Sequence, residues 1–76
     1  MIRSIQAHRK REYPEGSRVE VTAWQVEGMD WDEVGNVPLG TLGTVDYHGT
    51  DGTVFVEWDN GVYLGALLTD VIKRVP

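Results

Sequence analysis

The stretch GTVFVEWDNGVYLGAL, residues 52–67, contains two alternating apolar runs that meet at Asn60-Gly61. An Asn-Gly pair between such runs is a strong hairpin signal, because a type I′ turn needs positive φ at both central residues. The spacing predicts Asp59 and Val62 as the pair of residues that flanks this turn. We therefore expect two antiparallel strands that are joined by a tight turn.

The same stretch predicts which of its side chains are buried. Val54, Val56 and Trp58 share one face of the first strand. Trp58 is expected in the core, since few other side chains of this chain bury comparable apolar area. Gly65, inside the second strand, predicts a bulge or a sharp bend.

Three further short strands are predicted outside this hairpin. Residues 18–24 (RVEVTAW) alternate strictly, which places Trp24 on the polar face, opposite the valines. Strands are also expected over 41–48 and 71–75, the latter after a single turn. Residues 25–40 break the alternation and predict a long loop, a kind of segment that is often functional or mobile.

Five short strands with glycine-marked turns predict an all-β fold, a small five-stranded SH3-like barrel. The long connection after the first strand and the single turn before the last strand match the order of such a barrel. We expect the barrel over residues 14–76, preceded by a basic N-terminal arm or short helix over residues 1–13.

The composition limits the size and the class of the protein. The 76 residues form at most one small domain, and without cysteine neither disulfides nor a thiolate metal site can stabilise it. The net charge is −5, and residues 19–72 contain ten carboxylates and no Lys or Arg. An anionic surface of this kind disfavours nucleic acid and suits solubility or a basic partner.

Three segments resemble a known family: GSRVEV (16–21), VPLGTLGTVDY (37–47) and DGTVFVEWDNGVYLGAL (51–67). Together they are similar to the small bacterial and phage domains known as domain of unknown function forty-three fourteen, with Leu42 where that family often has arginine. A looser resemblance extends to KOW-type and nitrile-hydratase-β-like barrels. The resemblance implies a barrel fold and an origin in a phage or mobile element, and it implies no activity.

Few residues suit catalysis. His8 lies in the basic segment, and His48 lies near Asp46 and Asp51, where a weak metal site is conceivable but a solvated turn is favoured. The carboxylates of 30–33 lack the later glycine and glutamate of a calcium loop. We expect a protein that is not an enzyme, with no metal and no cofactor.

Binding is the favoured function. Trp31 stands between carboxylates, which disfavour deep burial, whereas Trp24, Tyr47 and Tyr63 fit either a binding surface or the core. The candidate partner-binding residues are Trp24, Asp30, Trp31, Asp32, Glu33, Tyr47 and Tyr63. The predicted partner is a protein with a basic surface, and in a phage or mobile element it could be a host or defence factor that this acidic chain inhibits.

The alternative is weak binding of nucleic acid or nucleotide through the basic N-terminal segment. Its candidate residues are Arg3, Arg9, Lys10, Arg11 and Arg18. No apolar run approaches the roughly 20 residues that span a bilayer, and the start has no apolar signal-peptide core. We therefore expect a cytoplasmic protein without a membrane partner.

Overall fold

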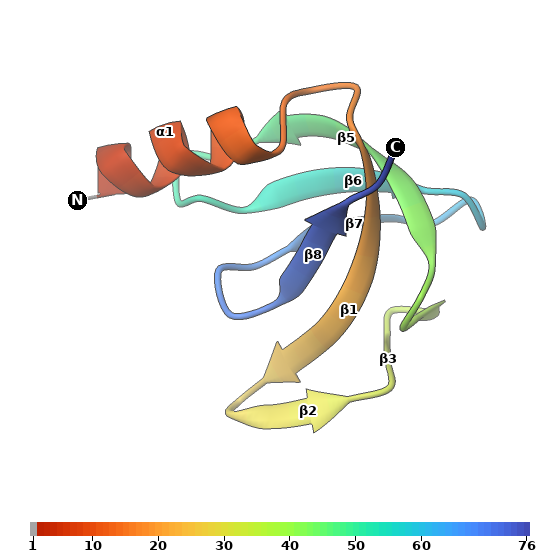
Figure 1. Cartoon of the computed structure of the whole chain (residues 1–76). Coiled ribbons are helices and arrows are strands. Elements are labelled where there is room, and N and C mark those ends of the chain that lie inside the picture. The colour runs from red at the N-terminus through yellow and green to blue at the C-terminus, as the bar shows by residue number, and fades with distance from the viewer. Residues whose placement is uncertain (1) are drawn as a thin grey trace.

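The computed structural model describes residues 2–76, with side chains from Ala7 onward. One helix, α1 (Ile2–Glu12), precedes all the strands (Figure 1). The strands are β1 (Arg18–Val26), β2 (Met29–Trp31), β3 (Glu33–Val34), β4 (Val37–Pro38), β5 (Leu42–His48), β6 (Val54–Trp58), β7 (Tyr63–Ala66) and β8 (Val71–Arg74). The fold is thus mostly β, with a single short helix at its N-terminal end.

Six of the strands form one curled antiparallel sheet in the order β2-β1-β5-β6-β7, and β8 pairs with β1. Strands β3 and β4 form a separate two-stranded hairpin. The sheet curves around the core as a half-barrel, with α1 along its upper end (Figure 1). The prediction of a small all-β barrel is confirmed.

Among the described side chains, ten buried ones form the core, and six of them are valines. Two tryptophans, Trp24 and Trp58, are the largest of them, with 1% of each side chain exposed. Their ring centroids lie 5.9 Å apart at an interplanar angle of 72°, which is the edge-to-face geometry that aromatic pairs prefer. The predicted burial of Trp58, Val54 and Val56 is confirmed.

The prediction that Trp24 lies on the polar face is wrong. The register between β1 and β8 shifts between Val21 and Ala23, which indicates a β-bulge or irregularity. An extra residue in one strand reverses the alternation beyond it, so Trp24 lies on the same side as Val21. The Trp24 indole N–H donates to the carbonyl oxygen of Val37 at 2.7 Å. Trp24 is therefore a core residue.

Residues 25–40 are not the irregular loop that we predicted, because two tight hairpins order them. Glu27 and Gly28 both have positive φ, at 52° and 76°, between the paired residues Val26 and Met29. Gly35 and Asn36 also have positive φ, at 57° and 68°, in the turn between β3 and β4. Both are two-residue turns of type I′ character, which matches the twist of the flanking strands.

The turn at Asn60-Gly61 joins β6 and β7 as predicted, but its type differs. Only Gly61 has positive φ, at 91°. The Gly61 N–H donates to the Trp58 carbonyl, and the Trp58 N–H donates to the Val62 carbonyl. The loop therefore has three residues, in the pattern of a type I turn that ends in a glycine bulge, and Trp58, not Asp59, faces Val62.

Gly65 marks close packing and not a bulge. The register between β6 and β7 is continuous, with Gly65 opposite Phe55. A Cβ atom at position 65 would lie 2.7 Å from Cγ2 of Thr53 and 3.2 Å from the Phe55 ring. The missing side chain makes room for Phe55 on the outer face of the sheet.

Polar contacts near Tyr13 attach α1 to the barrel. The Tyr13 hydroxyl donates to the Ile72 carbonyl at 2.8 Å, and Nε2 of His48 lies 2.6 Å from the Tyr13 carbonyl oxygen. The Gly16 N–H donates to the Val45 carbonyl. None of the helical segments in residues 2–76 combines the length and the hydropathy of a membrane span.

The packing around Gly43 predicts the effect of one extra methyl group. In Gly43→Ala, the new Cβ would lie 2.5 Å from Cγ1 of Val56 and 2.8 Å from Cε3 of Trp58. Overpacking of this kind typically costs about 1–3 kcal/mol. We expect chemical denaturation to show such a loss in the free energy of unfolding. The matched control, Leu42→Ala on the same strand, removes an exposed side chain and should stay within about 0.5 kcal/mol of the parent. An unchanged Gly43→Ala variant would contradict the packing described here.

Candidate functional site

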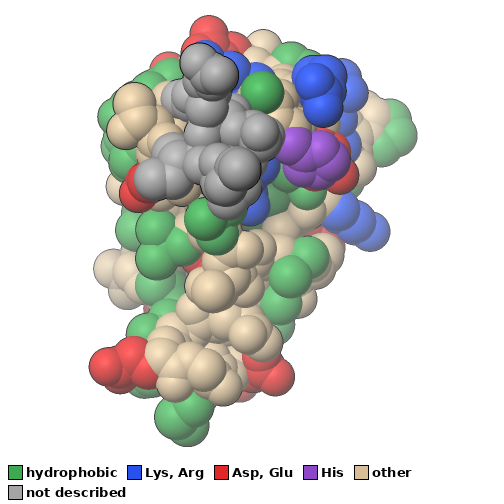
Figure 2. Space-filling view, turned by 90° about the vertical axis from the view of Figure 1, so that its left-hand side faces the viewer, with side chains coloured by type: hydrophobic (Ala, Val, Ile, Leu, Met, Phe, Trp, Pro, Cys, Tyr) green, Lys and Arg blue, Asp and Glu red, His purple; other side chains and the backbone are tan. Residues whose placement is uncertain are grey.

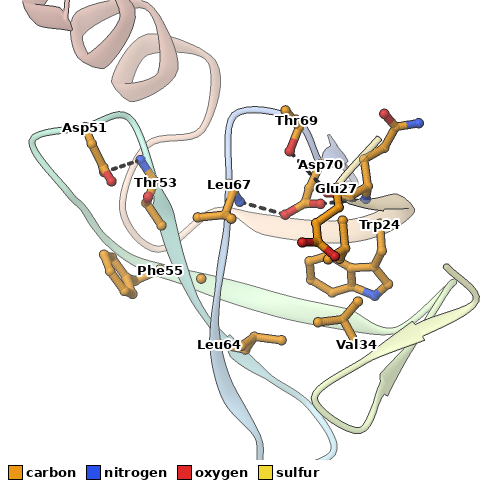
Figure 3. Close-up of a pocket in the computed structure, with 13 residues that line it drawn as sticks. Trp24, Glu27, Val34, Asp51, Thr53, Phe55, Leu64, Leu67, Thr69 and Asp70 are labelled. Carbon is orange, nitrogen blue, oxygen red and sulfur yellow. Dashed lines mark hydrogen bonds between the residues drawn. The ribbon is translucent and has the colours of Figure 1, made fainter. Parts of the chain in front are cut away.

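The main hollow of the described surface is a groove of about 670 Å³ where the curled sheet stays open. Val26, Glu27 and Val34 line one wall, from β1, the following turn and β3. Leu64, Gly65 and Leu67 line the other wall, from β7 and the residue that follows it (Figure 3). A groove with apolar walls and a few polar groups is the usual form of a binding site.

Asp70 fixes the two walls relative to each other. Its Oδ1 accepts the Gln25 N–H and its Oδ2 accepts the Leu67 N–H, each at 2.8 Å (Figure 3). The Thr69 hydroxyl also donates to the Gln25 carbonyl at 3.2 Å. Because Asp70 is buried and its two oxygens are engaged, it acts as a structural clamp between β1 and the turn before β8.

Every charged side chain that lines the groove is a carboxylate: Glu27, Asp51 and Asp70. Asp51 accepts the Thr53 N–H at 3.0 Å, and hydrogen bonds from Thr53 hold the pKa of Asp51 below its usual value. This carboxylate therefore stays ionised at neutral pH. Among the described residues, neither Lys nor Arg lines the groove.

The predicted acidic and aromatic residues lie next to this groove. Trp31 and Glu33, with Val26 and Val34, line a smaller hollow of about 230 Å³, so the two hollows share Val26 and Val34. Trp31 is 47% exposed, and the neighbouring Met29 is 64% exposed. The site thus extends from the groove to the tip of the β1–β2 hairpin.

The charges of the hairpin tip agree with those of the groove. Asp30 and Asp32 are exposed beside Trp31, and Oδ1 of Asp30 accepts a hydrogen bond from Nε2 of Gln25. Red carboxylates and green hydrophobic side chains gather at the end of the molecule formed by this hairpin, whereas blue basic side chains lie toward the end formed by α1 (Figure 2). On the face that Figure 2 shows, the basic side chains thus lie away from the hairpin tip.

A row of three aromatic rings crosses the outer face of the sheet. The rings of Tyr47 and Phe55 stack with centroids 4.6 Å apart and planes 8° from parallel. Phe55 and Tyr63 follow at 6.2 Å and 13°. Phe55 also lines the groove, so the structure brings Tyr47 and Tyr63 to its margin. We did not predict Phe55 as a site residue. The alternation nevertheless places its side chain on the face of the strand opposite to that of Trp58, which is this outer face.

Tyr63 is held by a carboxylate. Its hydroxyl donates to Oδ2 of Asp46 at 2.6 Å, and this hydrogen bond raises the pKa of Tyr63 to about 12. Burial and the negative charges of Asp46 and Glu57 act in the same direction. Tyr63 is 50% exposed, so its ring is fixed in place and still accessible.

The described basic residues of the alternative hypothesis differ in their contacts. Arg18 makes a two-pronged ion pair with Asp59, at 2.8 and 2.5 Å, and also donates to Thr44. The Arg9 guanidinium lies 5.7 Å from the centre of the Tyr13 ring. Lys10 and Arg11 are exposed on α1, and the side chain of Arg3 lies outside the described residues.

The weak metal site that we considered at His48 is not assembled. His48 contacts the Tyr13 carbonyl, Asp46 accepts from Tyr63, and Asp51 accepts from Thr53. Within the part of the chain that the structure describes, no three His, Asp or Glu side chains are grouped as metal ligands would be. The described carboxylates of residues 30–33 form no such group either.

The hydrogen bond from Tyr63 to Asp46 predicts that the Tyr63 phenol ionises at an unusually high pH. Ultraviolet absorbance of the tyrosinate ion should show one tyrosine that ionises near pH 12. In Asp46→Asn the negative acceptor is lost, and this pKa should fall toward the ordinary value of 10.0. Tyr47→Phe is the matched control, because it removes a neighbouring phenol and leaves the hydrogen bond intact. Equal titration of Asp46→Asn and the parent would contradict the contact.

Comparison with known proteins gives one match. The model of a family described as "Domain of unknown function (DUF4314)" matches residues 3–75, which is nearly the whole chain. No curated protein and no solved structure matches this sequence.

Proposed function

We propose that this chain, which belongs to the DUF4314 family, is a non-catalytic interaction module that binds a basic segment of a protein partner. The groove between β1, β3 and β7 is the proposed contact surface, together with the β1–β2 hairpin. The aromatic row of Tyr47, Phe55 and Tyr63 forms its outer margin. Trp24, which we first expected among the binding residues, is buried and lines the groove.

One observation carries the proposal: among the described residues, the charged groups that line the apolar groove are all acidic. Glu27 and Asp51 line the groove itself, and Glu33 lines the adjoining hollow beside Trp31. An exposed tryptophan within a ring of carboxylates supplies both apolar contact area and charge selection. A partner with Lys or Arg beside apolar side chains complements this surface, and an acidic partner is repelled.

A catalytic role has less support. Of the two histidines, His48 is buried against the Tyr13 carbonyl, and His8 lies on α1 within 3.3 Å of Glu12. Neither histidine lies among the residues that line the groove. A general acid or base must lie within hydrogen-bond reach of bound substrate, and these two positions do not offer that geometry.

Nucleic-acid or nucleotide binding through the basic segment is the alternative function. Lys10 and Arg11 on α1 favour it, because both are exposed. Arg18 contributes less to this alternative, since Asp59 already neutralises it. We expect any such binding to be weak and strongly reduced by salt.

The resemblance to phage domains suggests a setting for the module. A phage or mobile element that encodes this chain would use it to occupy, and so inhibit, a basic surface of a host protein. This part of the proposal is tested by the genes that flank the coding sequence. Neighbouring genes for phage structure or integration support it, and a conserved housekeeping operon contradicts it.

The hairpin tip is the first target for mutation. Synthetic peptides of equal length and equal apolar content, with either lysine or glutamate at the charged positions, serve as probes in fluorescence-anisotropy titrations. Trp31→Ala should weaken binding of the lysine peptide by about tenfold or more, which is the loss typical of an interface anchor. The triple change Asp30→Asn, Asp32→Asn, Glu33→Gln should weaken it and reduce its salt dependence.

The control variant is Val71→Ala, which removes an exposed side chain of β8 that does not line the groove and should leave binding unchanged. Thermal unfolding of each variant separates a lost contact from lost stability. Equal binding of the lysine and glutamate peptides contradicts the proposed function. Tighter binding of short RNA or DNA than of either peptide favours the alternative.

A further inference from the structure

Strand β7 has one unpaired edge that is ready for hydrogen bonding. It pairs with β6 on one side and with no other strand in the described residues. The Trp58 N–H donates to Val62, which makes these two residues a hydrogen-bonded pair. Such pairs alternate along an antiparallel ladder, so the backbone N–H and C=O groups of Tyr63 and Gly65 point away from β6.

This unpaired edge lies at the groove. Leu64 and Gly65 of β7 line it, and Val26, Glu27 and Val34 line the opposite wall. In Figure 3 the β7 ribbon runs through the middle of the view, with Phe55 on one side and Val34 and Trp24 on the other. Gly65 has no side chain, so nothing of its own screens its backbone groups.

Proteins usually protect such an edge with proline, with lysine, or with a covering helix or loop. Strand β7 reads YLGA and contains neither proline nor lysine. Helix α1, the one helix of the described residues, packs against β5, which is separated from β7 by β6 in the sheet (Figure 1). The edge is therefore open to an added strand, and strand addition is an established mode of peptide recognition.

Charge selects the occupant of this edge. Carboxylates stand on both sides of β7: Glu27 and Asp51 at the groove, and Asp46 and Glu57 beside Tyr63 on the outer face. A second copy of this chain would bring the same carboxylates to the same edge, and like charges on facing strands are destabilising. The side chains of an extended segment alternate between the two faces, so its basic side chains meet carboxylates on whichever face of β7 they lie.

We propose that a basic, extended segment of a protein partner adds to the edge of β7 as a further strand and occupies the groove. This inference rests on the proposed function and adds the binding mode to it. The amides of Tyr63 and Gly65 donate to the segment, and their carbonyls accept from it. Apolar side chains of the segment face Val34 and Leu64, and its basic side chains face Asp46 and Glu57.

The test uses the full chain and two capped synthetic peptides of equal length and charge. One alternates lysine with valine and can form a strand, and the other alternates lysine with proline, which lacks an N–H at every second residue and disfavours a paired strand. We expect the lysine–valine peptide to bind about tenfold or more tightly than the lysine–proline peptide. Amide hydrogen exchange followed by NMR should slow at Tyr63 and Gly65 when the lysine–valine peptide binds.

Two variants at position 63 separate the backbone from the side chain. Tyr63→Ala removes the ring and keeps the N–H, whereas Tyr63→Pro removes both. Since the Tyr63 N–H points away from β6, proline is compatible with this edge position. We expect Tyr63→Pro to bind the lysine–valine peptide about tenfold more weakly than Tyr63→Ala. If a thermal melt shows that Tyr63→Pro is not folded, the amide exchange of Tyr63 and Gly65 in the parent protein decides whether a strand is added.

Several outcomes overturn the inference, and they are distinguishable. If both lysine peptides bind tightly and amide exchange at Tyr63 and Gly65 is unchanged, strand addition is rejected. The proposal of a basic partner is then retained. Binding of neither peptide rejects the proposed function as well. Slower exchange at Tyr63 and Gly65 with rising protein concentration alone assigns the edge to a second copy of this chain and rejects a basic segment as its occupant.

Discussion

The contact between Trp24 and Trp58 is the interaction on which the rest of the structure depends. The two indoles meet edge to face in the core, and each also donates its N–H to a backbone carbonyl, of Val37 and Leu64 respectively. A chain of 76 residues without disulfides has few groups large enough to fill a core. Truncation of such a buried tryptophan typically costs about 3–5 kcal/mol, which is a large share of the stability of a small domain.

The same contact determines the shape of the site. Trp24 binds the Val37 carbonyl and so holds the β3–β4 hairpin against β1. Trp58 binds the Leu64 carbonyl and so fixes β7, which forms the opposite wall of the groove. Asp70 then links β1 to the turn after β7. The groove is therefore a consequence of how the core is built, and its carboxylates lie on a rigid frame.

Much of this fold could be predicted from the sequence, because alternation and turn residues act locally. The hairpin around Asn60-Gly61, the burial of Trp58 and the turn before β8 all follow from patterns within a few residues. The Glu27-Gly28 and Gly35-Asn36 turns could also have been predicted from the sequence, because each stands between short apolar segments. The burial of Trp24 could not be predicted from the sequence. The irregularity that turns Trp24 inward arises where β1 pairs with β8, almost fifty residues away in the sequence.

The candidate site was predictable only in part, for a similar reason. The exposure of Trp31 followed from its carboxylate neighbours, which oppose burial. The aromatic row was not predictable, since Tyr47, Phe55 and Tyr63 come from three strands and meet only through the register between them. The open edge of β7 is likewise a property of the whole sheet, and no local pattern marks it.

The measurement that tests this account most directly is amide hydrogen exchange of Trp24→Phe. Phenylalanine keeps an aromatic ring in the core but cannot donate to the Val37 carbonyl. The account predicts that exchange accelerates in β2, β3 and β4 while β5 and β6 stay protected, because the hairpins lose their attachment and the main sheet does not. Unchanged exchange over residues 29–38, or an equal acceleration along the whole chain, would contradict the role assigned to this contact.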